Sequence, residues 1–263
     1  MKKANQQFRS LHLLLIAMAF ALIALLSMGH VYAAAINETE PNDNMTTANT
    51  IIVGDTVYGS TPVKNMGIYD QNYDWFKFNP PVSGNAVVNI WADAYTTKDI
   101  SEIHCYVYDS SNNRLGEAHD TVTTTGGGNV TFPVTYGNSY YLHIYATDGT
   151  GIFTDVSYHY TVGYSIGRTT IKSAKPKKKA FTVSWNKKAK TSFYQVQYIK
   201  KSVFQDYSWS KAKVVNVSGK SKTKKVKGLA RKKKYYVRVR VARNIAGVTY
   251  YSPWSPRKSV KTK

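Results

Sequence analysis

A short acidic segment near the N-terminus carries the side chains best suited to metal chemistry. Its sequence is Glu38-Thr39-Glu40-Pro41-Asn42-Asp43. In an extended chain, side chains two positions apart point to the same side, so Glu38, Glu40 and Asn42 can converge on one point. Pro41 favours the extended state at Glu40, and Asp43 adds another carboxylate. Such an oxygen set suits Ca²⁺, which takes roughly six to eight oxygens in flexible geometry, better than Mg²⁺, which needs a tight octahedron.

The same segment has a second interpretation, as a solvated acidic loop. Asn42 or Asp43 would then cap a single helical turn over residues 45–49. A metal shell would also need carboxylates from a distant strand, and the local spacing does not supply them. On the residues alone, both interpretations stay open.

Catalytic chemistry is not expected. The only cysteine, Cys105, alternates in phase with Ile103 and Val107, which predicts a core position rather than a nucleophile. The sequence has no Gly-x-Ser-x-Gly elbow, and the Gly126–Gly128 run lacks the Lys-Ser/Thr continuation of a phosphate loop. The histidines do not have zinc-ligand spacing. We therefore expect a protein that is not an enzyme.

Charge divides the chain into two unlike parts. Residues 35–167 carry a net charge of −10, and residues 168–263 carry +28, with Asp206 as their only acid. A field of this strength attracts polyanions, and salt weakens the attraction strongly. In an exported protein the polyanion would be a cell-wall polymer, an acidic polysaccharide or, without specificity, nucleic acid. The alternative is that the charge serves solubility and attraction to the acidic part of the chain.

The first residues have the pattern of an export signal. Lys2, Lys3 and Arg9 precede an apolar run from Leu11 to Leu26, and small residues follow at Ala33–Ala35. We expect residues 1–34 to be a cleaved signal peptide and the protein to be secreted or held at the cell surface, with no membrane span after cleavage. An uncleaved anchor is the alternative, because the run approaches the length of a span.

Hydrophobic alternation predicts strands throughout the rest of the chain. Every second residue is apolar in segments such as Val88–Ala92, Ile103–Val107, Leu142–Ala146 and Tyr235–Val241, and Gly, Asn, Asp and Ser separate the segments. Many short strands without long helices are typical of sandwiches. We therefore predict an all-β protein with two antiparallel β-sandwich domains, at residues 35–167 and 168–263.

The first domain resembles the bacterial pre-peptidase C-terminal domain, which includes the collagen-binding domains of clostridial collagenases. The likeness lies in the segment ETEPND, Ala48, the strand Ile51–Val53 and the run Asp74-Trp75-Phe76-Lys77-Phe78. It implies a jelly-roll-like sandwich that binds calcium through its N-terminal segment and an acid before the aromatic strand. The ligands that the resemblance implies here are Glu38, Glu40, Asn42, Asp43 and Asp74. A further acid is expected where this chain has Gln71, and the neighbouring Asp70 can substitute for it.

Two rows of aromatic side chains offer a second candidate surface. With Leu142 and Ile144 facing the core, Tyr141, His143 and Tyr145 share the opposite face, and by the same alternation Tyr106 and Tyr108 share it on another strand. Such rows can bind an extended peptide or glycan. Tyrosine is also simply favoured in strands, where it pairs across neighbours, so a purely structural role is the alternative.

The second domain resembles a fibronectin type III domain. Trp185 has the position of the core tryptophan, Tyr194–Tyr198 that of the third strand, and Leu229 with Tyr235 that of the tyrosine corner. The turn Tyr250-Tyr251-Ser252-Pro253-Trp254-Ser255 and the lysine-rich loops are similar to versions on Gram-positive surface proteins.

Together these features predict a non-catalytic binding protein. A calcium-ordered sandwich and a basic fibronectin type III module would adhere to the cell wall or to another extracellular polymer, a polyanion, a polysaccharide or a fibrous protein. One alternative is an accessory module or remnant of an exported peptidase that targets a substrate such as collagen. Another is an architectural spacer.

Overall fold

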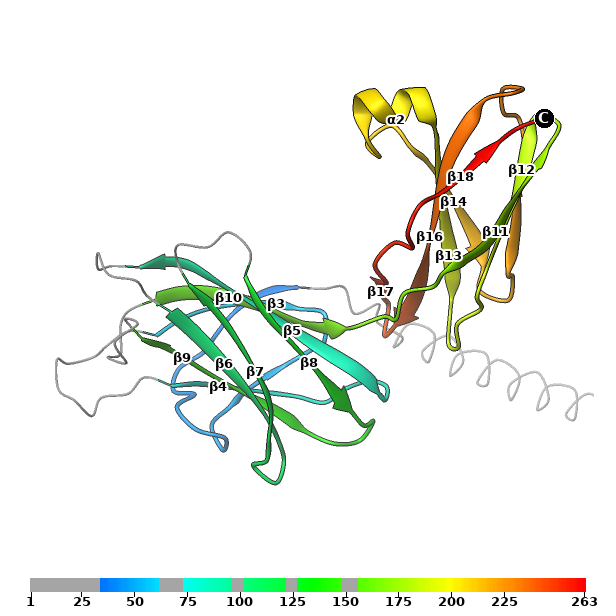
Figure 1. Cartoon of the computed structure of the whole chain (residues 1–263). Helices are drawn as coiled ribbons and strands as arrows, with labels where there is room; N and C mark the ends of the chain where they lie inside the picture. Colours follow the sequence, from blue (N-terminus) through cyan, green and yellow to red (C-terminus); the bar gives the residue numbers. More distant parts are fainter. Residues whose placement is uncertain (1–33, 62–72, 96–101, 122–126, 148–155) are drawn as a thin grey trace, which may run out of the picture. The chain divides into compact units, whose positions relative to one another are not determined.

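The computed structural model describes residues 34–61, 73–95, 102–121, 127–147 and 156–263. The predicted signal peptide therefore lies outside the described residues, except for Ala34. Two β-sandwiches follow one another along the chain (Figure 1). In the described part of the chain, no helix has the length and apolar character needed to cross a bilayer.

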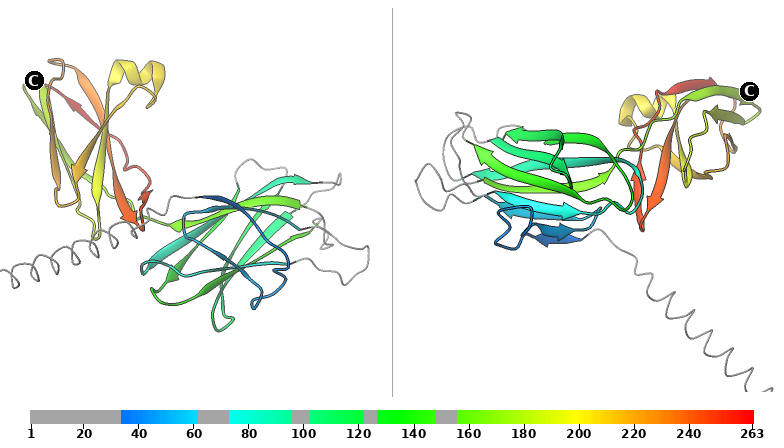
Figure 2. Two further views of the ribbon diagram at one scale, coloured as in Figure 1. Left: turned by 180° about the vertical axis from the view of Figure 1, so that it is seen from behind. Right: turned by 90° about the horizontal axis from the view of Figure 1, so that it is seen from below.

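The first sandwich consists of two five-stranded sheets. Its strands are β1 (Ala35–Asn37), β2 (Asn49–Ile51), β3 (Thr56–Ser60), β4 (Asp74–Phe78), β5 (Gly84–Tyr95), β6 (Glu102–Asp109), β7 (Arg114–Thr121), β8 (Gly128–Val134), β9 (Tyr140–Thr147) and β10 (Val156–Tyr164). One sheet has the order β1-β3-β10-β5-β8, and the other has the order β2-β4-β9-β6-β7. The strands lie in two layers (Figure 2).

This strand order is that of a jelly roll with an extra short strand on each sheet. Strands β3 to β10 alternate between the sheets, apart from β6 and β7, which pair within one sheet, and the pairs among these eight strands are antiparallel. The two additions, β1 and β2, pair in parallel with β3 and β4. β1 directly precedes the acidic segment and β2 follows it. The segment therefore runs from the edge of one sheet to the edge of the other.

The predicted alternation sets the core of the first sandwich. The inward residues of β6 and β9 are buried, at Ile103, Cys105 and Val107 and at Leu142, Ile144 and Ala146. Phe76 and Phe78 of β4 are fully buried against them, and Tyr158 and Tyr160 of β10 close the core from the other sheet. Period-two patterning therefore places polar residues of the same strands on the outer faces.

The second sandwich pairs a three-stranded sheet with a five-stranded one. Its elements are β11 (Ile171–Lys177), β12 (Ala180–Trp185), β13 (Phe193–Lys200), α2 (Lys201–Tyr207), β14 (Lys213–Ser218), β15 (Thr223–Val226), β16 (Lys234–Ile245), β17 (Val248–Tyr251) and β18 (Lys258–Lys261). The sheet orders are β11-β12-β15 and β14-β13-β16-β17, and β18 also pairs with β16. The all-β prediction of two antiparallel sandwiches is confirmed.

The landmarks predicted for this sandwich lie where the sequence places them. Trp185 is 1% exposed and packs in the core with Tyr194, Val196 and Phe181. The hydroxyl of Tyr235 accepts a hydrogen bond from the backbone N–H of Ala230 at 3.1 Å, which ties the loop before β16 to the strand. This contact is the tyrosine corner of such sandwiches.

A ladder of alternating guanidinium and aromatic groups covers the outer face of β16. Arg238 lies between the rings of Trp209 and Trp254, at 4.0 and 4.6 Å from the ring centroids. Arg240 lies between Trp254 and Tyr251, at 4.5 and 3.9 Å. Each Nε–H also donates to a glutamine of β13, Arg238 to Gln197 and Arg240 to Gln195. We call these five cations and rings the aromatic–arginine ladder.

Two serines hold the chain against β16 where it leaves β17. The hydroxyls of Ser252 and Ser255 accept hydrogen bonds from the backbone N–H groups of Val241 and Val239, each at 3.0 Å. Their own backbone N–H groups donate to the carbonyls of the same two valines. The serines thus satisfy backbone groups of β16 that a regular strand would pair, and they place Trp254 between the two arginines.

We predict that Trp254→Ala destabilises the second sandwich. The substitution removes the ring that both arginines contact, and the loss of two cation–π contacts with the ring's packing is expected to cost about 2–4 kcal/mol in the free energy of unfolding. Urea unfolding followed by far-ultraviolet circular dichroism measures the change. Tyr207→Ala is the control, because Tyr207 is 53% exposed and its loss should cost no more than about 0.5 kcal/mol. Equal effects of the two substitutions would contradict a stabilising role for the ladder.

Candidate metal centre and aromatic face

Three carboxylates converge at the edge of the first sandwich. Glu38 and Glu40 follow β1, and Asp74 is the first residue of β4. Their carboxylate oxygens lie within 4.8 Å of one another, close enough for one ion to contact all three. We call Glu38, Glu40 and Asp74 the carboxylate cluster. Residues 36 positions apart in the sequence therefore form one site.

Backbone hydrogen bonds position each member of the cluster. β1 pairs with β3, and beyond this pairing the N–H of Ser60 donates to Glu38 Oε1 at 2.6 Å. The N–H of Asn42 donates to Glu40 Oε2 at 3.1 Å. The carbonyl of Asn42 in turn accepts from the N–H of Trp75 at 2.9 Å, which fastens the segment to the start of β4 beside Asp74.

The buried hydroxyl of Tyr158 joins two of the carboxylates. It lies 2.6 Å from Asp74 Oδ2 and 3.0 Å from Glu38 Oε2. A hydroxyl has only one hydrogen to donate, so it cannot donate to both ionised groups at the same time. Burial raises the pKa of Asp74 to about 9, and the negative charge of Glu38 adds to this effect. Burial also raises the pKa of Glu38. Without a cation, the cluster therefore tends to retain a proton.

Two further oxygens in the same region lack the partners that buried polar atoms need. Asn42 and Asp74 are both 0% exposed. Asn42 Oδ1 and Asp74 Oδ1 have no hydrogen-bond partner among the described residues. Buried polar atoms are nearly always satisfied, so these two acceptors, one inside the carboxylate cluster and one next to it, have room for a cation or water as a partner.

The donor set fits Ca²⁺. Calcium binds oxygens at about 2.3–2.6 Å, so ligands on opposite sides of one ion lie about 5 Å apart, in keeping with the 4.8 Å spread of the cluster. All available donors are oxygens, from three carboxylates and the Asn42 amide. A cavity of about 200 Å³ opens on the Glu38 side of the cluster, between the N-terminal segment and Phe76. The residues present thus fit the metal that the family resemblance implies.

The predicted ligands do not all lie in the cluster. Asp43 is exposed and lies outside the group of carboxylates that the structure brings together. Asp70, with Gln71, falls outside the described residues. The predicted cap is also different, because Asn44, rather than Asn42 or Asp43, accepts hydrogen bonds from the N–H groups of Thr46 and Thr47. This cap leaves the Asn42 side chain in the interior.

Sequence reasoning missed two residues that shape the cluster. Tyr158 supplies the hydroxyl that lies between Asp74 and Glu38. Gly59 of β3 leaves space for the cluster, because a Cβ there would lie 2.4 Å from the Tyr158 hydroxyl and 2.6 Å from Glu38 Oε2. Neither role has a local sequence signal, since both depend on how β3, β10 and β4 meet.

The five predicted aromatic-row residues share one outer face, on β6 and β9. β6 pairs with β9 in a register that sets Tyr106 opposite His143 and Tyr108 opposite Tyr141. The hydroxyl of Tyr145 donates to that of Tyr106 at 2.9 Å. Trp75 of β4 and Tyr73 extend the face. We call Tyr73, Trp75, Tyr106, Tyr108, Tyr141, His143 and Tyr145 the aromatic face.

His143 lies at the centre of this face. Its ring stacks on Trp75 at 4.5 Å with an interplanar angle of 10°, and it meets Tyr73 edge to face at 4.6 Å. Its Nε2 is buried and has no hydrogen-bond partner among the described residues. Burial lowers the pKa of His143 to about 4, so the imidazole is neutral at physiological pH. The rings are half-buried, so this face can offer stacking surfaces while its members pack on one another.

The cysteine has the surroundings predicted for a core residue. Cys105 is fully buried between Ile103 and Val107, and burial raises the pKa of its thiol. A thiol that stays protonated is a poor nucleophile.

The second sandwich has a fibronectin type III-like fold. Its strand order, buried Trp185 and tyrosine corner carry this assignment. No family model matches the chain, and no curated protein matches it. Solved structures that resemble it include the FN1–FN3 domains of chicken CNTN1, at 14% identity and a TM-score of 0.33, covering 70% of this chain and 64% of that one.

Two more fibronectin type III structures resemble the chain. A two-domain segment of chicken tenascin has 16% identity and a TM-score of 0.33, and the match covers 72% of this chain and 98% of that one. An fn3 domain of human contactin 1 has 16% identity and a TM-score of 0.31, with 37% and 78% covered. The chain thus spans just under two thirds of the CNTN1 structure and nearly all of the tenascin segment.

We predict that His143 makes the stability of the first sandwich depend on pH. The unfolded imidazole takes up a proton near pH 6.5, whereas the folded one resists protonation down to about pH 4. Its contribution is therefore complete above pH 6.5 and is lost as the pH falls toward 4. Between pH 7 and 5.5, the wild-type chain should lose about 1 kcal/mol relative to His143→Phe, allowing for partial solvent screening.

Urea unfolding of both proteins across this pH range measures the difference, and the comparison cancels the titration of the shared carboxylates. His119→Phe, at an exposed position of β7, is the matched control for replacing an imidazole. A wild-type minus His143→Phe difference that is constant with pH would contradict the prediction.

Proposed function

We propose that the chain is an exported, non-catalytic binding protein with a calcium-ordered first sandwich and an adhesive, basic second sandwich. One observation supports the calcium assignment above all others. The carboxylate cluster joins side chains of β4 and of the N-terminal segment, and its buried Asp74 Oδ1, like the neighbouring Asn42 Oδ1, has no hydrogen-bond partner among the described residues.

Calcium would fasten the N-terminal segment to the sandwich. Glu38 and Glu40 belong to that segment, whereas Asp74 belongs to β4, so one ion contacting all three bridges the two parts. The ion would also favour the ionised form of Asp74, whose pKa is otherwise raised. A ligand that binds only the folded state stabilises it by about 2.7 kcal/mol at a hundredfold excess over its Kd.

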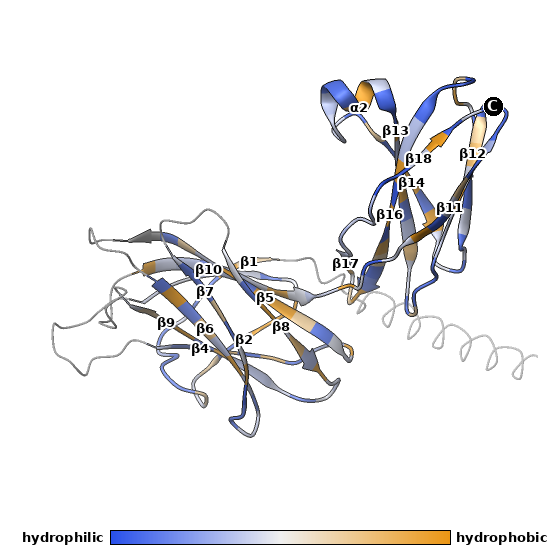
Figure 3. Cartoon of the chain, viewed as in Figure 1, coloured by the Kyte–Doolittle hydropathy of each residue, from blue (hydrophilic) through white to orange (hydrophobic). Residues whose placement is uncertain are grey.

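The second sandwich would supply the adhesive surface. Its +28 charge is spread over turns and strands, and Figure 3 shows hydrophilic residues along α2, the loops and the strands of this part of the chain. Anionic cell-wall polymers or acidic polysaccharides are the partners that such a surface would attract, with nucleic acid as a non-specific competitor.

The aromatic face favours a second candidate function. An array of half-buried rings on one sheet can bind an extended fibrous protein or glycan, which is the expectation for an accessory module of an exported peptidase that targets a substrate such as collagen. A spacer role would leave both this face and the basic surface without a ligand. Binding assays with walls, collagen and the relevant peptidase separate the three.

We predict that the chain binds Ca²⁺ and that Glu40→Gln weakens binding by at least about tenfold, because it removes one carboxylate ligand from the shell. Isothermal titration calorimetry measures Kd, and thermal unfolding with and without a chelator measures the stabilisation. Asp43→Asn is the control, because it removes the same charge from an exposed position three residues away. The control should bind calcium as the wild type does.

Asp74→Asn tests the same site through the melting temperature, which should respond differently with and without calcium. The amide resembles the protonated acid in shape, so the calcium-free protein should keep or increase its melting temperature while calcium no longer raises it. Equal binding heats for the wild type, Glu40→Gln and Asp74→Asn would overturn the calcium proposal.

We predict that the chain binds purified Gram-positive cell walls and that moderate salt releases it. Each phosphate or carboxylate contact releases counterions, so the logarithm of the binding constant should fall steeply and linearly with the logarithm of salt concentration. Sedimentation with washed walls across a salt series measures this dependence. Binding that is insensitive to salt, or no binding at low salt, would contradict the adhesive role of the basic sandwich.

A further inference from the structure

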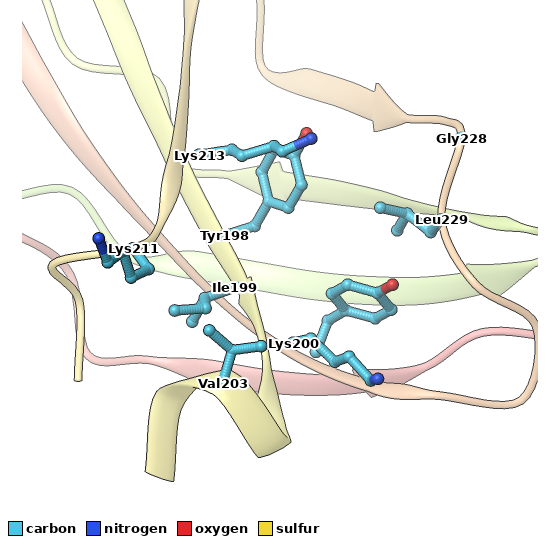
Figure 4. A pocket seen from close by; sticks show the side chains of 9 residues that line it. Tyr198, Ile199, Lys200, Val203, Lys211, Lys213, Gly228 and Leu229 are labelled. Atoms are coloured by element: carbon cyan, nitrogen blue, oxygen red, sulfur yellow. The ribbon is translucent and has the colours of Figure 1, made fainter. Parts of the chain in front are cut away.

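A pocket opens at one end of the second sandwich, between its two sheets. Its volume is about 230 Å³. Figure 4 shows it from close by. The lining residues come from β13, α2, β14, the loop after β15 and the start of β16. We call it the lysine-rimmed pocket.

The pocket exists because two edge strands leave the end of the core uncovered. β14 is the edge of one sheet, and β15, which precedes Gly228 and Leu229, is the edge of the other. Tyr198, Leu229 and Tyr235 belong to the core or pack against it, so they form an apolar floor. Gly228 has a φ of +73° and no side chain, and a Cβ added there would meet nothing within 4 Å. The loop therefore turns without filling the opening.

Three lysines surround this apolar floor. Lys200 ends β13, Lys213 begins β14, and Lys211 lies just before it (Figure 4). Asp206 is the only acid in residues 168–263, so this part of the chain has almost no carboxylates with which to neutralise them. An apolar cavity surrounded by lysines without acidic partners selects a ligand that inserts an apolar group and carries acidic groups on either side of it.

The size of the pocket indicates what enters it. Sites for whole small molecules have volumes of about 300–1,000 Å³, and this pocket is smaller. It has room for a single apolar side chain that anchors a longer ligand. Buried anchors of this kind, surrounded by weaker polar contacts, provide most of the affinity at protein interfaces.

The adjacent edge strand adds a backbone template. Within the described residues, β14 pairs only with β13, so its other edge has unpaired N–H and carbonyl groups. Val214 on this strand is 47% exposed. An extended peptide can add to such an edge as a further strand, with its side chains entering neighbouring pockets.

We propose that the lysine-rimmed pocket and the edge of β14 bind an extended acidic peptide with one apolar anchor residue. The anchor fills the pocket, flanking carboxylates pair with Lys200, Lys211 and Lys213, and the peptide backbone pairs with β14. A glycan or a nucleic acid has no peptide backbone for strand addition, and its hydrated units gain little from an apolar floor. The site is separate from the carboxylate cluster, so it does not depend on calcium binding.

The test uses the full chain and a fluorescein-labelled peptide of about ten residues, the length of a strand with its flanks. The peptide alternates Glu and Thr around one central Leu. Fluorescence anisotropy at low salt measures its Kd. A second peptide has Ser in place of Leu, and polyphosphate serves as an unlabelled competitor of another chemical class. We expect the Leu peptide to bind at least about tenfold more tightly than the Ser peptide, because only Leu fills the pocket.

Matched charge variants locate the site. Lys211→Gln/Lys213→Gln removes two cations from the rim, and Lys187→Gln/Lys188→Gln removes two from the turn before β13, about 20 Å away along that strand. All four lysines are exposed, so both variants should fold. Circular dichroism checks that they do. The rim variant should lose about tenfold in affinity and the control about twofold or less.

Three results would overturn the proposal. Equal losses in the two variants would show non-specific charge attraction. Equal affinity for the Leu and Ser peptides would show that the pocket takes no anchor. If polyphosphate displaces the labelled Leu peptide at a lower concentration of negative charge than unlabelled Leu peptide does, the site is one for phosphate polymers instead.

Discussion

The first sandwich depends on the burial of one carboxylate. Asp74 begins the strand that carries Phe76 and Phe78 into the core, so its side chain is placed in the interior by the alternation of β4. An ionised carboxylate cannot remain there without compensation. Tyr158, Glu38 and the Asn42 backbone are arranged around this position, and the raised pKa of Asp74 records the incomplete compensation. These contacts hold the N-terminal segment where a bound cation can complete the compensation of the Asp74 charge.

The same alternation that builds the core also builds the aromatic face. β6 and β9 direct their aliphatic residues inward, and the residues between them, among them His143 and the tyrosines at 106, 108, 141 and 145, must then share the outer surface. The antiparallel register brings the two rows together, and Trp75 joins them because β4 pairs with β9. One sheet therefore has an aliphatic inner face and an aromatic outer face.

In the second sandwich, rings and guanidinium groups take the place of ion pairs. With a single acid in residues 168–263, the arginines of β16 cannot be neutralised by nearby carboxylates. Arg238 and Arg240 instead stack between aromatic rings and donate to glutamines, which stabilises them without cancelling their charge. The sandwich thus keeps both its stability and its positive field. Of the lysines around the pocket, Lys211 contacts a single ring, that of Tyr207 at 5.9 Å, and in our proposal all three pair with an acidic ligand.

Local patterning alone determined the strands and the inward residues of this protein, and the family resemblance located the core landmarks Trp185 and Tyr235. Period-two alternation identified Cys105 as buried and placed Tyr141, His143 and Tyr145 on one face, because the direction of a side chain in a strand depends only on its position. The spacing of Glu38 and Glu40 showed that they could converge on one point, and the family resemblance made them candidate ligands. Only the tertiary structure excluded Asp43 from the cluster, brought in Tyr158 and Gly59, and opened the lysine-rimmed pocket. These features arise where strands distant in sequence meet, and no short segment contains the information about which strands become neighbours or edges.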